Sequence, residues 1–425
     1  MLNRTQAPEF KGVEHINFLR VQKNELDNGI PVFVLNGGDQ NLVRVEFIFG
    51  NVNWDAEKPL LSQITNSMLN EGTAKLNSAD IANQIDFYGA YFQTEFGLDR
   101  STVTLYSLNK YLENTLPIVQ DVLTNSIFPQ KELNNFLNNQ KQRLKVSLEK
   151  KDYLARKRFN ELMFGKTLYG YSASLEDYDT VKREDLMVHF KKQYHPQNCT
   201  LVVSGKFDET ALMALLNQLF GNWESEAHFT PNQFHINKIE PVFDITEKEN
   251  ALQSAIRLGV QTVNRTHPDF VGLLLLNTVL GGYFGSRLMN NIREDKGYTY
   301  GIGSGNICLE NVGYLTIGSE VGVDVCKATF QEIEKEINIL RTQPVPDSEL
   351  EVVKNFFLGS VLGSLENIFS HADKFKSIYF YGLDYTYFDN YIEKIKNITA
   401  EDLMHLANKY LDYDKLVKVV VGKFG

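Results

Sequence analysis

Residues that could bind a transition metal are few and scattered in this sequence. A catalytic zinc site needs three imidazole, carboxylate or thiolate ligands and one open position. Neither His-x-x-Glu-His nor His-Glu-x-x-His occurs, and the cysteine spacing matches no metal-binding signature. His189 and His195 are six residues apart around the expected end of a helix, so they do not face each other. We therefore predict no metal site among the histidines and cysteines, which are His15, His189, His195, His228, His235, His267, His371, His405, Cys199, Cys308 and Cys326.

A second set of residues, in the segment GGYFGSRLMNNIREDKGYTYGIGSG at 281–305, could act on a peptide bond. Arg293 offers a fixed fork of donors, and Tyr300 offers a rigid phenolic donor. Acyl-transfer transition states gain most from preorganised donors aimed at the oxygen. The alternative is structural: Arg293 ends a helix that stops at Gly297, and Tyr300 is a strand aromatic. For Arg287 we expect packing at a helix start.

Composition excludes several classes of function. The chain has 425 residues, 43 Lys plus Arg against 53 Asp plus Glu, and a net charge of −10. This acidic balance argues against binding nucleic acid or anionic lipid. The longest apolar run, Phe270–Leu280, is too short to cross a bilayer, and the first residues carry no apolar core of a signal peptide. With an odd number of cysteines, these features predict a cytoplasmic protein.

The sequence also repeats itself. Nearer the start of each half the offset is smaller, and Leu69 would pair with Leu280, an offset of 211 (280 − 69). We predict an N-terminal domain at 1–221, a polar linker at 222–245 and a C-terminal domain at 246–425. Four short matches share one offset of 217 (401 − 184): Glu184–Met187 with Glu401–Met404, Gly205–Phe207 with Gly422–Phe424, Pro129 with Pro346, and Ser147–Glu149 with Ser364–Glu366.

Both halves show the same order of secondary structure. Each begins with a half-buried strand, followed by a helix that starts near a proline, Pro59 or Pro268. Further strands follow, then long helices, and each half closes with a β-branched strand, Cys199–Ser204 or Leu416–Val421. This order predicts an α+β fold of two homologous halves, each a mainly antiparallel sheet packed with helices.

The order of these elements and motifs resembles the pitrilysin/insulinase-type zinc metallopeptidases, also called inverzincins, over nearly the whole chain. In that family the first helix carries His-x-x-Glu-His shortly before a Gly-Thr pair. Aligning on Gly72-Thr73 places the two histidines on Gln63 and Ser67 and the glutamate on Asn66. The family's third ligand, a glutamate, would fall near Ser147. An amide and a hydroxyl are poor zinc ligands, and Asn66 cannot serve as a general base.

The resemblance implies a role for the second half. The segment Ser286–Leu288, Arg293, Gly297 and Tyr300 is similar to the family's C-terminal substrate-binding signature. By this resemblance Arg293 hydrogen-bonds a substrate carbonyl and Tyr300 donates to the developing oxyanion. In some subfamilies a sister subunit carries His-x-x-Glu-His and the zinc, and the two subunits enclose a chamber for unfolded peptides.

We therefore expect a non-zinc subunit of a heterodimeric peptidase, with no cofactor of its own and zinc in the partner. Such a chain would be inactive alone. Two alternatives remain at this stage: a scaffold subunit without a catalytic role, and a self-associating protein that captures peptides without cleaving them.

Overall fold

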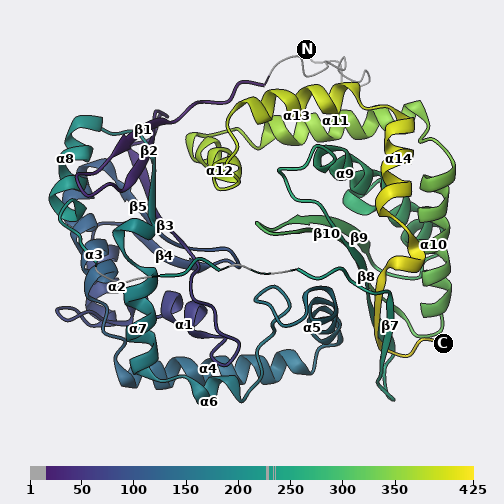
Figure 1. Ribbon diagram of the computed structural model, residues 1–425, viewed down its shortest axis with the longest axis horizontal. Coiled ribbons are helices and arrows are strands. Elements are labelled where there is room, and N and C mark those ends of the chain that lie inside the picture. Colours follow the sequence, from purple (N-terminus) through teal and green to yellow (C-terminus); the bar gives the residue numbers. More distant parts are fainter. Residues whose placement is uncertain (1–15, 226–228, 233, 235) are drawn as a thin grey trace, which may run out of the picture.

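The protein, described by a computed structural model at residues 16–225, 229–232, 234 and 236–425, has two α+β halves. Each half contains one mixed sheet that is mainly antiparallel, with helices packed against it (Figure 1). The predicted fold class is therefore confirmed. Among the described residues, no helix is long and apolar enough to span a membrane.

The first sheet has the spatial strand order β1-β2-β6-β3-β5-β4. Only β2 and β6 run parallel, and the other neighbours are antiparallel. Its central strand β3 is buried at seven consecutive positions, as expected for a strand covered on both faces. The strands are β1 (Gln22–Glu25), β2 (Pro31–Asn36), β3 (Leu42–Gly50), β4 (Tyr91–Phe96), β5 (Arg100–Leu108) and β6 (Cys199–Gly205).

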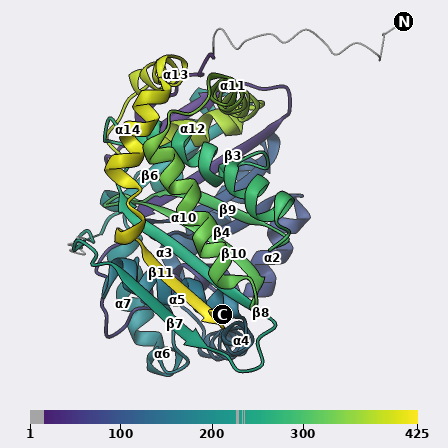
Figure 2. The same ribbon diagram turned by 90° about the vertical axis from the view of Figure 1, so that its right-hand side faces the viewer.

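The second sheet has the order β7-β11-β8-β10-β9, again with one parallel pair, β7 with β11. Figure 2 shows α10 and α14 lying across the side of this sheet that faces the viewer. Its strands are β7 (Val242–Glu247), β8 (Gln253–Thr262), β9 (Ile302–Cys308), β10 (Gly313–Gly322) and β11 (Val417–Gly422).

Helices make up most of the remainder of both halves. Those of the first half are α1 (Leu61–Ser67), α2 (Ser78–Phe87), α3 (Leu112–Asn125), α4 (Gln130–Leu148), α5 (Lys151–Phe164), α6 (Asp177–Thr180), α7 (Arg183–Gln193) and α8 (Glu209–Phe220). The helices of the second half are α9 (Phe270–Asn277), α10 (Cys326–Thr342), α11 (Asp347–Gly363), α12 (Ile368–Tyr379), α13 (Thr386–Asn397) and α14 (Ala400–Tyr410), together with two π-helical turns at Thr278–Gly282 and Met289–Asp295.

The element bounds of the two halves keep the offsets seen in the sequence. Helices α4 and α11 begin at positions 130 and 347, and α7 and α14 begin at positions 183 and 400, so both pairs have the offset of the four short matches. Strands β3 and β8 begin at positions 42 and 253, with the smaller offset of Leu69 and Leu280. The predicted linker at 222–245 is not a clean boundary of secondary structure, because β7 begins inside it at Val242. The domain division stays a prediction.

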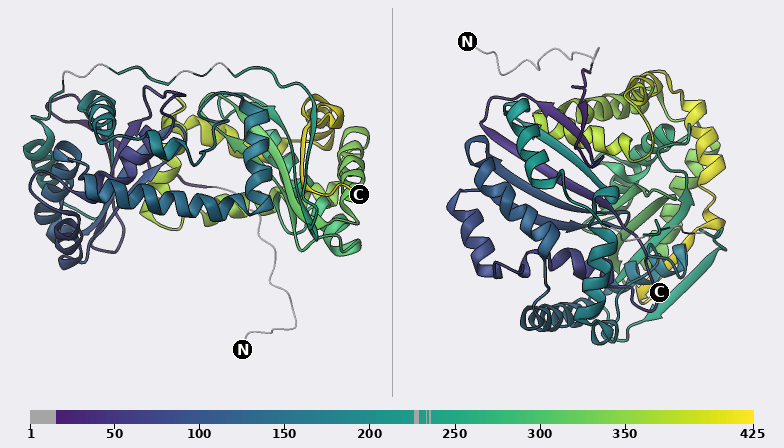
Figure 3. Two further views of the ribbon diagram at one scale, coloured as in Figure 1. Left: turned by 90° about the horizontal axis from the view of Figure 1, so that it is seen from below. Right: turned by 60° about the vertical axis from the view of Figure 1, so that its left-hand side comes forward.

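Each half contributes one helix to the sheet of the other half. Helix α5 packs on β8 and β11 through Phe159 and Met163, which join a cluster with Val417 and Val419. Figure 3 shows α5 beside the green strands of the second half. An ion pair between Arg158 and Asp244, with a 2.7 Å contact, adds to this packing.

Helix α12 makes the reciprocal contact with the first sheet. Its Phe375 packs at a ring distance of 4.7 Å from Phe33 of β2, in a cluster that also contains Val202 of β6. On the same helix Lys376 forms an ion pair with Glu46 of β3 at 2.6 Å. The two halves are therefore held together by an exchange of helices, in addition to the chain that connects them.

Candidate functional site

Helix α1 carries the positions aligned with the zinc motif. Its apolar side, with Ile64 at 1% exposure, belongs to the core of the first half, together with Met68 just after the helix. Gln63 is exposed and Ser67 is half-buried, so these side chains, one turn apart, occupy the face directed away from the core. The helix has kept its packing while presenting an amide and a hydroxyl where the family presents imidazoles.

Asn66, at the position of the family's glutamate, is fully buried. Its Nδ2 donates to the hydroxyl of Tyr194 at 3.0 Å, and Gln193 Nε2 donates to the same hydroxyl at 3.4 Å. Burial raises the pKa of Tyr194 well above its usual range. Asn66 is thus a hydrogen-bonding core residue, and it has no basic atom that could activate water.

His189 is the histidine nearest to this helix, and it is also a core residue. Its Nε2 lies 3.0 Å from Ser62 Oγ and 2.9 Å from Gln193 Oε1. Burial lowers the pKa of His189 to about 4, so the ring is neutral at physiological pH. His189 is therefore a buried, hydrogen-bonded histidine. Sequence reasoning missed that His189, Gln193 and Tyr194 form one buried polar group with Asn66.

The position of the third ligand fits zinc no better. Ser147 lies in the last turn of α4, where its Oγ donates to the carbonyl of Arg143 at 3.0 Å. Glu149 follows the end of α4 and is exposed. Within the described part of the chain, no three His, Cys, Asp or Glu side chains are grouped so that they could hold a metal ion. His15, His228 and His235 lie outside the described residues. The residues at the motif positions do not fit zinc.

Arg293 belongs to the second π-helical turn, Met289–Asp295. The turn is followed by Gly297 with a φ of 66°, the left-handed conformation that the sequence predicted for a helix stop. Arg293 Nε donates to the backbone carbonyl of Tyr300 at 2.9 Å, and its guanidinium also pairs with Glu294. The guanidinium stacks 4.9 Å from the ring of Phe284. Arg293 therefore fixes the backbone of Tyr300, the other residue of the predicted substrate-binding pair.

Tyr300 is 93% exposed. It precedes β9, which begins at Ile302, so its interpretation as a strand aromatic is wrong. The backbone next to it is held in place, because Thr299 Oγ1 donates to Glu320 O at 2.7 Å and accepts from Ser319 Oγ at 2.9 Å. A well-anchored backbone thus presents a phenol almost entirely to solvent.

Arg287 has a structural environment. Its Nε and Nη2 donate to the two carboxylate oxygens of Glu349 on α11, at 2.9 and 2.8 Å. This bidentate pair joins the segment before the π-helical turn to α11. The expected packing role of Arg287 agrees with this geometry.

Comparison with known proteins shows which family the chain is similar to. The family described as "Peptidase M16 inactive domain" matches residues 180–357. An "Uncharacterized zinc protease" of Rickettsia felis is 25% identical over 408 residues, covering 91% of this chain and 94% of that protein. The chain is therefore similar to M16 peptidases, in sequence over most of its length and to the family model at residues 180–357.

Two further proteins are similar to this chain over most of its length. A "Non-peptidase homolog YmxG" of Helicobacter pylori is 22% identical over 381 residues, covering 85% of this chain and 84% of that protein. The crystal structure of a peptidase M16 inactive domain from Pseudomonas fluorescens has the same fold, with a TM-score of 0.85 and 22% identity over 95% of this chain and 98% of that one. These matches confirm the resemblance to pitrilysin/insulinase-type peptidases that the sequence motifs indicated.

Proposed function

We propose that this M16 protein is the non-zinc subunit of a two-subunit peptidase. It would bring Arg293 and Tyr300 to the active site of a sister subunit that carries His-x-x-Glu-His and the zinc ion. The observation that carries the proposal is a contrast within the chain. Asn66 is sealed into the core by Tyr194, whereas the Tyr300 phenol is 93% exposed on an anchored backbone.

The geometry suggests which part of the substrate Arg293 and Tyr300 would each contact. Arg293 uses Nε for the Tyr300 carbonyl and Nη1 for Glu294, which leaves Nη2 for a peptide carbonyl. The phenol of Tyr300 would donate to the oxyanion that forms when the sister subunit's water attacks the peptide bond. The substrate would be an unfolded peptide bound between the subunits. Alone, the chain would neither bind zinc nor cleave peptides.

A second candidate is a catalytically inert subunit that acts as a scaffold or binds peptides. The name of the Helicobacter pylori relative, "Non-peptidase homolog", favours this reading. Two nitrogens of Arg293 already bind groups of this chain, which also favours the inert subunit. These contacts stabilise the folded chain whether or not a substrate is present.

A cytoplasmic location belongs to the proposal as well. It is supported by the state of Cys199, Cys308 and Cys326, which are all unpaired.

The two candidates differ in what Tyr300 does to turnover. The test is to mix the purified chain with a sister subunit bearing His-x-x-Glu-His and to follow cleavage of a fluorogenic peptide. We expect no activity from this chain alone and zinc-dependent cleavage by the mixture. In the mixture, Tyr300→Phe should lower kcat by about 10²-fold with little change in KM, because the phenol acts only in the transition state.

Tyr91→Phe is the matched control, since Tyr91 is also exposed but lies on β4 of the other half. It should leave kcat unchanged. Full activity of the Tyr300→Phe mixture would refute the catalytic role and support the inert subunit. Loss of complex formation in size-exclusion chromatography would instead assign Tyr300 to the interface between subunits.

A further inference from the structure

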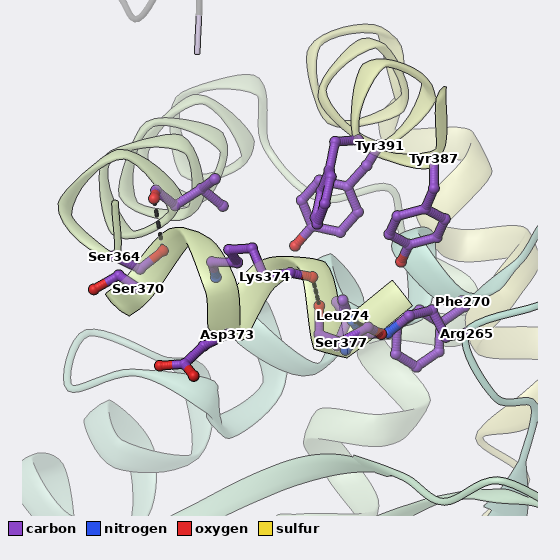
Figure 4. Close-up of a pocket in the computed structure, with 12 residues that line it drawn as sticks. Arg265, Phe270, Leu274, Ser364, Ser370, Asp373, Lys374, Ser377, Tyr387 and Tyr391 are labelled. Carbon is purple, nitrogen blue, oxygen red and sulfur yellow. Dashed lines mark hydrogen bonds between the residues drawn. The ribbon is translucent and has the colours of Figure 1, made fainter. Parts of the chain in front are cut away.

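A cavity of about 410 Å³ lies within the second half, between α9, α12 and α13 (Figure 4). This volume is in the range of small-molecule sites. Its walls are largely apolar, with Phe270 and Leu274 from α9, Val361 from α11 and Phe388 from α13. No part of it belongs to the zinc-motif helix or to the segment of Arg293.

Two cations, Arg265 and Lys374, and one carboxylate, that of Asp373, border this cavity. Within the described residues, neither cation forms an ion pair with a carboxylate. Asp373, next to Lys374 in sequence, is instead paired with Arg44 and Lys376, each at 2.9 Å. In Figure 4 the side chains of Asp373 and Lys374 leave α12 in different directions. The cavity therefore has a positive charge that the surrounding protein leaves uncompensated.

The position of Lys374 is electrostatically unfavourable without an anion. Burial lowers its pKa and the nearby charge of Arg265 lowers it further, while the carboxylate of Asp373 opposes this shift in part. Arg265 is itself enclosed by aromatic rings, with its guanidinium 5.8 Å from Phe270 and 5.9 Å from Tyr387. One of its donors, Nε, is buried without a partner. An anion between the two cations would relieve their mutual repulsion.

Hydroxyl groups add further donors. The hydroxyl of Tyr387 is buried and has no hydrogen-bond partner. Burial raises the pKa of Tyr387 to about 12 and that of Tyr391 well above its usual range, so both phenols stay protonated. The serine hydroxyls differ, because Ser370 and Ser377 already donate to Asn367 Oδ1 and to the Lys374 carbonyl. The free polar groups of the cavity are thus mainly donors.

We propose that this cavity binds a small organic carboxylate with an apolar body. The carboxylate would lie between Lys374 and Arg265 and accept from the hydroxyl of Tyr387, while the apolar body would pack on Phe270 and Leu274. An apolar body is required because aromatic and aliphatic side chains form most of the wall. The site lies outside the proposed peptidase residues, and its occupancy is independent of zinc in a partner.

Ligand binding here would act on the helix that joins the halves. Lys374 faces the cavity, and Phe375, the next residue of α12, packs on the first sheet. A carboxylate bound to Lys374 would fix α12 from the side opposite to that contact. Binding is therefore expected to raise the midpoint of thermal unfolding of the whole chain.

The test uses three probes on the full chain at pH 7: 4-phenylbutyrate, its neutral amide 4-phenylbutyramide, and inorganic phosphate. Isothermal titration calorimetry should give a millimolar Kd for the carboxylate, as expected of a fragment-sized ligand. The amide should bind about tenfold or more weakly, because it lacks the charge. Phosphate should neither bind comparably nor compete.

Variants locate the site. Lys374→Met should weaken 4-phenylbutyrate by about tenfold or more, and Tyr387→Phe by a few-fold while the fold is kept. Lys394→Met removes a charge from an exposed position of α13 that does not line the cavity, and should leave the Kd unchanged. The proposal is overturned by absent binding, by equal binding of acid and amide, or by an unaltered Kd in both Lys374→Met and Tyr387→Phe. Phosphate that displaces the carboxylate would overturn the need for an apolar body.

Discussion

The segments that follow the first long strand of each half differ in whether their key polar side chains are buried or exposed. In the first half, residues 61–90 form two regular helices, and α2 begins with a capping box between Asn77 and Asp80. In the second half, residues 272–301 contain most of α9 and two π-helical turns, and leave Phe284 and Tyr300 exposed. We call residues 61–90 the sealed segment, for the buried Asn66, and residues 272–301 the presenting segment, for the exposed phenol of Tyr300.

The two segments differ in the fate of their polar groups. In the sealed segment, Asn66 donates to a partner inside the protein, as does the adjoining His189 of α7 with Gln193. In the presenting segment, Arg293 fixes a backbone, and the phenol beside it has no partner among the described residues. Loss of a metal site is tolerated where a buried hydrogen bond replaces it, whereas an exposed phenol adds nothing to folding. Substitutions should therefore affect stability in the first segment and function in the second.

The largest effect should come from placing a carboxylate in the sealed segment. Asn66→Glu restores the family's residue in a fully buried position beside Tyr194. We expect the free energy of unfolding at pH 7 to fall by about 3–5 kcal/mol, as for an uncompensated buried charge. Urea unfolding followed by circular dichroism measures it. Asn66→Gln is the neutral control, and Tyr300→Glu should change stability by no more than about 0.5 kcal/mol. Equal losses in the Glu variants of both segments would remove the contrast.

The second effect is a dependence of stability on pH in the first half. The folded-state pKa of His189 is about 4, below the ordinary value of 6.5. Folding therefore favours the neutral ring, and its contribution is complete above pH 6.5 and declines as the pH falls from 6.5 toward 4. The decline could reach about 3 kcal/mol.

The matched variant for this dependence is His189→Leu, which introduces the residue type of the equivalent position, Leu406, at an offset of 217. Urea unfolding at pH 7.0, 6.0, 5.0 and 4.5 should give a shallower pH profile for this variant than for the natural chain. Parallel profiles would show that His189 is not the titrating group.

The smallest effect compares two phenols. Tyr194→Phe removes the hydroxyl that accepts from Asn66 and Gln193, and should lower the free energy of unfolding by about 1–3 kcal/mol, the cost of an unpaired buried donor. Tyr300→Phe should change it by less than about 0.5 kcal/mol. Denaturation of both variants under one condition gives the comparison. Similar losses in the free energy of unfolding for Tyr194→Phe and Tyr300→Phe would mean that the Tyr300 hydroxyl also stabilises the fold.

Much of the fold was predictable because it depends on local patterns. The long helices predicted after the strands of the first half include Gln130–Leu148, and the closing strand predicted at 199–204 is observed as Cys199–Gly205. The stop at Gly297 followed from the conformational freedom of glycine. For the helix aligned with the zinc motif, the alignment on Gly72-Thr73 was enough to predict that Gln63 and Ser67 are poor zinc ligands.

The remaining features depend on contacts between distant residues. Asn66 and Tyr194 are 128 residues apart, and no local pattern links them. The π-helical turns differ from an α-helix by one residue in their hydrogen bonding, which the side-chain spacing does not specify. The cavity beside Lys374 is formed by side chains from several helices, so it has no sequence signature of its own.

The exchange of α5 and α12 has a consequence during synthesis. The first sheet is complete once β6 has been made at Gly205, but Phe375, which covers Phe33 and Val202, belongs to a helix far downstream in the chain. At typical translation rates the intervening segment takes about 10 to 30 seconds to appear. During that interval an apolar sheet face stays uncovered on the ribosome. The nascent first half is therefore a natural client for a chaperone until its borrowed helix emerges.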